Sequence, residues 1–311
     1  MMMRRLVVVA GLAAVAIAVS VAPACADDLS DYLADADEAI YSGKRFVGTT
    51  WDGIVSAGIV EVQHHGGMAT VGSGSAYATV GDGRWFRGDP DEDGFSFVRR
   101  SIPDSTGRYT IAHGDPAEHL GRSAHVLDIL ENGELRMRVI VDDSTSAPVV
   151  TEVYAPDGSV FRSSSMVEFS VSADADMVAG GDREYRMMVP LDEIDFPAEA
   201  AGYELIDAYA APESALQAFY TDGLFSFSLF STSGRADWTA SADDVHPYVA
   251  GEYAYLRVVK PATVWVLWNA PDRAMALVGD LPPDHIEAVL AELPRPGAEN
   301  WMKRIWNRIF G

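Results

Sequence analysis

Tight-turn dipeptides between alternating segments are the feature that most constrains how this chain folds. Asp82-Gly83, Asn132-Gly133 and Asp157-Gly158 each separate two runs of strand-forming residues. A primed two-residue turn needs positive φ at both central residues, and Asn, Asp and Gly tolerate that conformation best. Strands joined in this way pair antiparallel. The sequence therefore predicts an antiparallel meander rather than a parallel α/β sheet.

The strand patterns fall into two groups. The first runs from Arg45 to about Val171, and the second follows residue 200, where Asp222-Gly223 separates two further strand patterns. Residues 172–199 are less patterned and contain Pro190 and Pro197, which is typical of a connection between domains. We therefore predict a first domain over residues 27–171, a linker over 172–199 and a smaller second domain over 200–295.

Two amphipathic segments predict helices. Leu29 to Ser42 places apolar residues on one stripe at helical spacing, with acidic residues opposite. Pro282-Pro283 opens a second helix, and Pro294 ends it. The buried stripe expected for this second helix is Ile286, Val289, Leu290 and Leu293. With two sets of antiparallel strands, these helices predict an α+β fold.

The first 26 residues have the order of a signal peptide. Arg4 and Arg5 precede an uncharged apolar run from Leu6 to Ala22, and Ala24-Cys25-Ala26 offers the small residues that a signal peptidase reads. We expect export and removal of residues 1–26. Two alternatives stay open: an uncleaved anchor, although the run barely spans a bilayer, and lipidation of Cys25.

The chain is strongly acidic, and its charge limits its partners. The formal net charge is −23, and removing the two arginines of the signal peptide makes it −25. Such a surface repels nucleic acid and anionic lipid headgroups. We therefore expect no nucleic-acid partner. A solvated acidic surface without a specific partner explains the charge equally well.

The sequence contains no pattern typical of catalysis. There is no G-x-S-x-G elbow, and the seven histidines do not cluster at ligand spacing. Asp89 to Gly94 opens like a calcium loop, but Arg100 stands at the twelfth position, where a bidentate glutamate is needed. We expect neither an enzyme nor a bound cofactor or metal.

Several segments together resemble the RseB/MucB family of regulators of extracytoplasmic sigma factors. Tyr220 to Ser228 resembles the family's Y-S-D-G-L-F-S-F-S strand pair, and Val278 to Pro283 resembles its V-G-E-L-P-P. Gly121 to Val126 resembles its G-R-x-A-x-V strand, and Thr49 to Gly53 its first strand. Arg136, Asp142, Thr145, Tyr154, Asp157 and Gly158 follow at the family's spacing. Ile140 and Ser146 depart from the pattern.

The resemblance implies both a fold and a function. It implies a first domain like LolA and LolB, an antiparallel half-barrel around helices, and a smaller α/β second domain. It also implies an exported negative regulator that binds the extracytoplasmic part of a membrane anti-sigma factor and shields it from proteolysis. Release would follow the binding of a lipid or lipoprotein acyl chain. The expected location is the periplasm or cell envelope, either soluble or peripherally attached to the membrane.

The residues themselves indicate where an apolar ligand could lie. Several strands break strict alternation, as at Val149-Val150, so the first sheet is predicted to be apolar on both faces. Helices would cover one face, and a ligand or ordinary protein would cover the other. The predicted ligand surface is Trp51, Val139, Val141 and Val150.

The last segment, residues 296–311, is unlike the rest of the chain. It is predicted to form an amphipathic helix that contacts a membrane or a partner through Trp301, Lys303, Arg304, Ile305, Trp306, Arg308 and Phe310. Docking on the acidic body of the same protein is the alternative. For the whole chain, the alternative to a regulator is a lipid or lipoprotein carrier, and a hydrolase with an unrecognised site ranks third.

Overall fold

The computed structural model describes residues 39–65, 68–73, 76–81, 84–89, 92–98, 108–171, 183–185, 189–211, 215–238 and 244–297. These residues form two sheets: one is antiparallel throughout, and the other is antiparallel except for the parallel pair β6 and β12. The sheet of twelve strands, with its connections, is called the first lobe. The sheet of eight strands, with one α-helix, is called the second lobe. The predicted signal peptide and almost all of the predicted tail lie outside the described residues.

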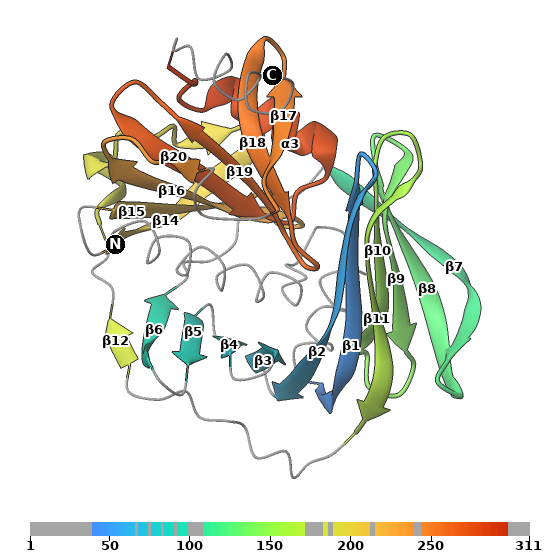
Figure 1. Ribbon diagram of the computed structural model, residues 1–311. Helices are drawn as coiled ribbons and strands as arrows, with labels where there is room; N and C mark the ends of the chain where they lie inside the picture. The colour runs from blue at the N-terminus through green and yellow to red at the C-terminus, as the bar shows by residue number, and fades with distance from the viewer. Residues whose placement is uncertain are drawn as a thin grey trace.

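The first lobe is a meander that curls on itself. Its strands are β1 (Ile40–Trp51), β2 (Ile54–His65), β3 (Met68–Ser73), β4 (Ala76–Gly81), β5 (Arg84–Asp89), β6 (Glu92–Val98), β7 (Tyr109–His119), β8 (Arg122–Glu131), β9 (Glu134–Asp142), β10 (Pro148–Tyr154), β11 (Val160–Ser170) and β12 (Arg183–Tyr185). Their order is β12-β6-β5-β4-β3-β2-β1-β11-β10-β9-β8-β7. Figure 1 shows β1, β2 and β7 to β11 standing upright, while β3 to β6 turn away from them to the left, below the second lobe.

The turns confirm the antiparallel prediction and correct one detail. Asn132 (φ 53°) and Gly133 (φ 84°) form the two-residue connection between β8 and β9. Asp52 and Gly53 connect β1 to β2 in the same way, with φ of 48° and 77°. Asp157-Gly158 lies instead within a five-residue connection, Ala155–Ser159, in which the Asp157 side chain accepts from the backbone N–H of Ser159. The dipeptide marked the turn correctly but not its length.

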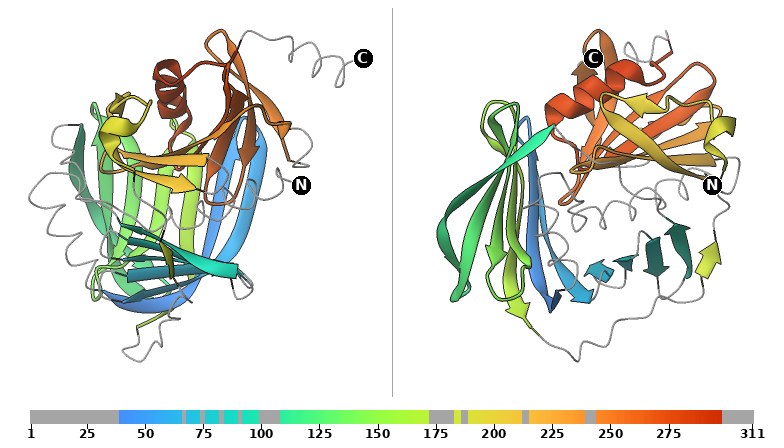
Figure 2. Two further views of the ribbon diagram at one scale, coloured as in Figure 1. Left: turned by 90° about the vertical axis from the view of Figure 1, so that its left-hand side faces the viewer. Right: turned by 180° about the vertical axis from the view of Figure 1, so that it is seen from behind.

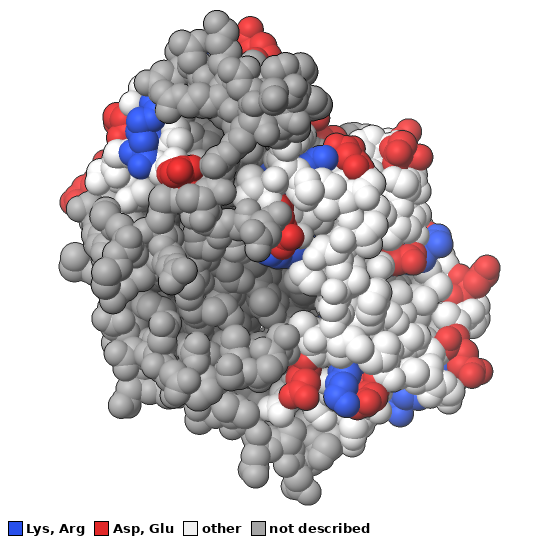
Figure 3. Space-filling view, in the orientation of Figure 1, with Lys and Arg blue, Asp and Glu red and all other residues white. Residues whose placement is uncertain are grey.

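Burial alternates along β1 and distinguishes the two faces of the sheet. Val47, Thr49 and Trp51 are buried on one face, called the inner face, from which Thr49 and Trp51 contact the second lobe. Phe46 and Ile59 pair across β1 and β2 on the outer face and are exposed. Figure 3 shows a broad uncharged area on this side of the molecule. The predicted apolar outer face is therefore present at β1 and β2, whereas the outer face of β8 and β9 carries the charged pair Asp128 and Arg138.

The second lobe lies across one end of the curled sheet (Figures 1 and 2). Its strands are β13 (Glu199–Ala200), β14 (Tyr203–Ala211), β15 (Ala215–Thr221), β16 (Ser226–Ser233), β17 (His246–Ala250), β18 (Tyr253–Val259), β19 (Val264–Asn269) and β20 (Arg273–Gly279). Their order is β13-β14-β15-β16-β20-β19-β18-β17. Helix α3 (Pro283–Glu292) packs on one face through Ile286, Val289 and Leu290, which confirms the predicted stripe.

The described structure is richer in strands than the α+β prediction. It contains one α-helix, α3, and the short 3₁₀ helix η2 (Leu191–Glu193). The predicted helix from Leu29 to Ser42 is wrong at its end, because Ile40 to Ser42 already belong to β1. Tyr41 is buried there and stacks on His64 of β2, with ring centroids 5.0 Å apart. This cross-strand packing outweighs the helical spacing of the sequence. Residues 29–38 lie outside the described part.

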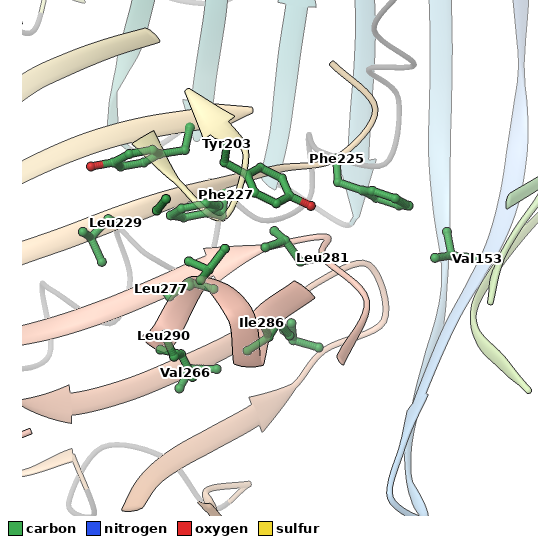
Figure 4. Close-up of a cluster of buried hydrophobic side chains, with 14 of the residues drawn as sticks. Val153, Tyr203, Phe225, Phe227, Leu229, Val266, Leu277, Leu281, Ile286 and Leu290 are labelled. Carbon is green, nitrogen blue, oxygen red and sulfur yellow. The ribbon is translucent and has the colours of Figure 1, made fainter. Parts of the chain in front are cut away.

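A single apolar cluster spans both lobes. Phe161, Met137 and Val153 contribute from the first lobe, and Phe227, Leu277 and Ile286 are among its members in the second. Figure 4 shows Val153 at one side of this cluster, with Phe225 between it and the other second-lobe side chains. The two lobes therefore share part of their core.

Candidate functional site at the junction of the two lobes

Turns and strand ends of the first lobe meet turns and strand ends of the second lobe. The β1–β2 turn, the β8–β9 hairpin and the start of β7 lie at one rim of the first sheet. The facing parts of the second lobe are the β15–β16 and β18–β19 connections and the start of α3. Hydrogen bonds and ion pairs cross this junction at several separate points, and buried side chains form most of them.

Glu131, at the end of β8, is the centre of the largest polar cluster. Its carboxylate accepts from Arg108 at 2.8 Å, from Arg136 at 2.8 Å and from His285 of α3 at 2.9 Å. Burial acts against ionisation, but the hydrogen bonds from His285 and Arg108 outweigh it and hold the pKa of Glu131 at about 2. The carboxylate is therefore charged at any physiological pH.

Arg136 and Asp284 extend this cluster. Arg136 donates from both terminal nitrogens to the two carboxylate oxygens of Asp284, at 3.1 and 2.9 Å, and also donates to the carbonyl oxygen of Tyr154. A bidentate pair of this kind fixes orientation as well as distance. Asp284 is in the first turn of α3, where a negative charge also favours the helix dipole. The pair ties the start of α3 to the β8–β9 hairpin.

A second polar contact joins β7 to the β15–β16 connection. The Tyr109 hydroxyl donates to Asp222 at 2.7 Å, and Arg108 approaches the same carboxylate at 3.2 Å. The other oxygen of Asp222 accepts from the backbone N–H groups of Leu224 and Phe225. Burial and the adjacent Asp222 raise the pKa of Tyr109, so its hydroxyl stays a donor. Asp222 thus shapes its own turn and binds the first lobe.

The opposite end of the junction combines aromatic rings with a cation. The guanidinium of Arg257 lies 4.7 Å from the Trp51 ring centre and 5.5 Å from that of Tyr248, and Arg257 donates to Asp52 at 2.6 Å. The Trp51 and Tyr248 rings meet edge to face, with centroids 4.9 Å apart. Cation–π and aromatic contacts of this geometry are attractive when water is excluded.

Arg162 and Asp280 form the fourth point of contact. Arg162 of β11 and Asp280, which follows β20, are both buried, and their nearest charged atoms are 3.6 Å apart. Burial raises the pKa of Asp280 to about 6 and lowers that of Arg162. The Asp280 carboxylate also accepts from the backbone N–H of Ser226 at 2.7 Å. In both groups burial has a larger effect on the pKa than the attraction between them, so the ion pair offsets only part of the lost hydration.

The junction holds the two lobes together. Its polar side chains are paired with one another across the lobes. Among the described residues, no group of three or more His, Cys, Asp or Glu side chains is placed to hold a metal ion. No helix in the described part is long and apolar enough to cross a bilayer. The arrangement can couple the position of one lobe to that of the other.

The structure brings together three of the four residues predicted to form the ligand surface. Trp51, Val139 and Val141 are buried on the inner face and belong to the cluster that spans both lobes. Val150 pairs with Ile140 on the outer face and is half-buried. Within the predicted tail, Pro296 and Gly297 alone are described, so the tail residues from Trp301 to Phe310 lie outside the described part.

Sequence reasoning missed most of the junction. Glu131, Arg108 and His285 were not singled out, and Arg136 was noted only for its spacing. A usable signal existed, because Glu131 directly precedes the tight-turn dipeptide Asn132-Gly133 and Asp52 is the first residue of Asp52-Gly53. Asp284 and His285 likewise follow the prolines that open α3. Charged residues at the ends of strands and helices predict the edge of a lobe. Only the fold shows which edges of the two lobes contact each other.

Fold and junction define a class: a two-lobed β protein whose curled antiparallel sheet is joined at its rim to a second sheet. The fold is RseB/MucB-like. The crystal structure of MucB in complex with MucA(peri) matches with a TM-score of 0.53 and 17% identity, covering 86% of this chain and 97% of that one. The crystal structure of MucB alone gives 0.52 and 17%, covering 88% and 100%.

A further structure, the Pseudomonas aeruginosa MucA/MucB complex, matches with a TM-score of 0.50 and 16% identity, covering 87% of this chain and 100% of that one. No family model matches the sequence, and a search of curated proteins finds no similar sequence. The three structural matches confirm, for the fold, the resemblance noted in the sequence. The matches include both lobes, because they cover 86–88% of this chain.

Proposed function

We propose that this protein is an exported negative regulator of a stress response controlled by a sigma factor. It binds the extracytoplasmic part of a membrane anti-sigma factor and shields that segment from proteolysis. The observation that carries the proposal is the fold match over both lobes to MucB, two structures of which are complexes with MucA. The acidic charge of the chain favours a partner segment rich in Lys and Arg.

Release is proposed to follow the binding of an amphiphile to the first lobe. The inner face of that lobe carries buried apolar residues, among them Val47, Val139 and Val141. The same cluster continues into the second lobe through Trp51 and Phe225. A ligand that displaced part of this packing would alter the contacts at the junction, so occupancy of one lobe would change the other.

A binding experiment tests the first part of the proposal. The mature chain is mixed with the extracytoplasmic segment of the anti-sigma factor encoded beside a sigma-factor gene, and binding is followed by calorimetry. We expect a complex at micromolar concentration or tighter, and slower cleavage of the segment by its protease. No complex at these concentrations contradicts the regulator and leaves a lipid or lipoprotein carrier, which needs no protein partner of this kind.

Two variants at the junction of the lobes provide a further test and its control. A carrier could hold its cargo within the first lobe alone, whereas a regulator with the proposed coupling needs the junction. Glu131→Ala removes the centre of the largest junction cluster, and Glu134→Ala changes an exposed residue nearby. We expect the first variant to weaken the link between amphiphile binding and partner release. The second variant should behave as the wild type.

A further inference from the structure

The inner face of the first lobe carries positive charge on an acidic protein. Arg45 of β1 and Arg162 of β11 are the two arginines buried on this face away from the Glu131 cluster. Arg162 has Asp280 of the second lobe as its partner. Arg45 is four positions before Thr49, which pairs with Arg162, so the backbone positions of the two arginines are about 13 Å apart along the sheet.

Arg45 has no carboxylate partner among the described residues. Its side chain is 2% exposed, and it donates to the carbonyl oxygen of Pro148 at 2.7 Å and to the sulfur of Met166 at 3.3 Å. A thioether is a weak acceptor. Burial raises the pKa of Tyr41, and both the charge of Arg45 and its side-chain hydrogen bond to Tyr41 act against that effect.

The surroundings of Arg45 are apolar. Val62, Val149, Ala147 and Met166 form a buried cluster around this part of the inner face. A buried cation without an anion loses most of its hydration and recovers little in return. Every other buried arginine of the described residues, Arg162 and Arg257, has an acidic partner. An unpaired charge in apolar surroundings is therefore a feature that stability alone does not explain.

We propose that Arg45 binds the acidic headgroup of an amphiphile whose hydrocarbon chain lies on the inner face of the first lobe. This inference rests on the proposed function, because it names the chemistry of the ligand that causes release. A carboxylate or phosphate gives the guanidinium the charged acceptor that the described residues do not supply. The apolar residues of β1, β9 and β11 are buried, so the hydrocarbon chain would replace part of their present packing.

The experiment compares ligands that share a chain and differ in the headgroup. The mature protein is titrated at pH 7.5 with dodecanoic acid, dodecyl phosphate and dodecan-1-ol, and separately with acetate and inorganic phosphate. A charge-assisted hydrogen bond predicts roughly ten- to hundredfold tighter binding of the two acidic amphiphiles than of the alcohol. The free anions, which lack a chain, should bind much more weakly than either.

Variants assign the preference to Arg45. Arg45→Met should bring the acidic amphiphiles to the affinity of the alcohol, and Arg45→Lys should keep part of the difference. Arg138→Met is the matched control, because Arg138 lies on the outer face of the same sheet and pairs with Asp128. Melting temperatures check folding: Arg45→Met should match or exceed the wild type, since it removes a poorly paired buried charge.

The possible failures are distinguishable. Equal binding of acid and alcohol by the wild type, or an unchanged preference in Arg45→Met, overturns this inference while amphiphile binding stands. Absence of binding by all three amphiphiles overturns both the inference and the proposed release step. Inorganic phosphate that binds as tightly as dodecyl phosphate indicates a simple anion site. A large fall in melting temperature in Arg45→Met, restored by Arg45→Lys, assigns Arg45 a structural role.

Discussion

Glu131 on β8 accepts a hydrogen bond at 2.9 Å from His285 on α3, although 154 residues separate them in the sequence. Both side chains are buried, so water competes little for this contact. Arg108 and Arg136 bind the same carboxylate from the first lobe. The second lobe is thus held by a charged group that the first lobe has already oriented.

Removing the Glu131 carboxylate should destabilise the protein strongly. Glu131→Ala leaves Arg108, Arg136 and His285 without their shared acceptor, and breaking a buried ion pair typically costs about 3–5 kcal/mol. Urea unfolding at pH 7 measures the loss. Glu134→Ala, at an exposed position of the same hairpin, should change the unfolding free energy by less than about 0.5 kcal/mol. Similar losses in both variants would contradict the central role of Glu131.

We expect Asp280 to make the free energy of unfolding decrease as the pH rises from about 4 to about 6. Its pKa is raised to about 6 in the folded protein from an ordinary value of 3.8, because it is buried. The folded state therefore favours the protonated carboxyl. This contribution is fully present below pH 4 and is lost as the pH rises to about 6. The shift corresponds to about 3 kcal/mol.

Asp280→Asn isolates that effect. The amide oxygen can still accept from the N–H of Ser226, and the side chain stays neutral. We expect the variant to match the wild type near pH 4 and to exceed its unfolding free energy at pH 7. Urea unfolding of both proteins at four pH values gives the difference curve. A difference that does not change with pH would show that Asp280 does not titrate in this range.

We expect Arg257 to stabilise the protein more through its contacts with the Trp51 and Tyr248 rings than through its ion pair with Asp52. Asp52 is two-thirds exposed, so water screens its attraction to Arg257. Asp52→Asn keeps a residue that tolerates the positive φ at this turn and should cost at most about 1 kcal/mol. Arg257→Lys loses the planar group that faces Trp51 and Tyr248 and should cost more. Thermal unfolding ranks the two, and the reverse order would contradict this account.

The sequence predicted the local features better than the way they assemble. Asn132-Gly133 marked a turn correctly because both residues tolerate positive φ whatever surrounds them. The stripe of α3 was correct because one apolar face with helical spacing fits one orientation. Tyr41 was assigned to a helix because spacing alone ignores His64, 23 residues later, on which its ring stacks. Local rules fail where a distant partner decides.

The candidate site shows the same limit. Val139 and Val141 were placed on one face correctly because alternation has a period of two. Val150 was grouped with them, but the register shift between Pro148 and Val150 and its pairing with Ile140 put it on the opposite face. The polar junction depends on contacts between residues more than 100 positions apart, such as Arg136 with Asp284. The periodicity of a sequence gives no information about pairs of residues that are so far apart.

The C-terminal segment is proposed to contact membranes, and truncation tests this. Lys303, Arg304 and Arg308 lie among the apolar residues Trp301, Ile305, Trp306 and Phe310. Each basic residue near an anionic surface contributes about 1 kcal/mol, so three give roughly a hundredfold preference for anionic vesicles. The rest of the chain is acidic and is repelled by the same surface. Binding by the whole chain must therefore come from this segment.

Co-sedimentation with phosphatidylglycerol vesicles compares the mature chain with one that ends at Pro296. We expect the mature chain to sediment at low salt and the shortened chain to stay in the supernatant. Raising the salt to 0.5 M should weaken the binding, because screening shortens the reach of the charges. Phosphatidylcholine vesicles, which carry no net charge, are the control. Equal sedimentation of the two chains would rule out the C-terminal segment as the membrane contact. The alternative, docking of the segment on the acidic body of the same protein, would then remain.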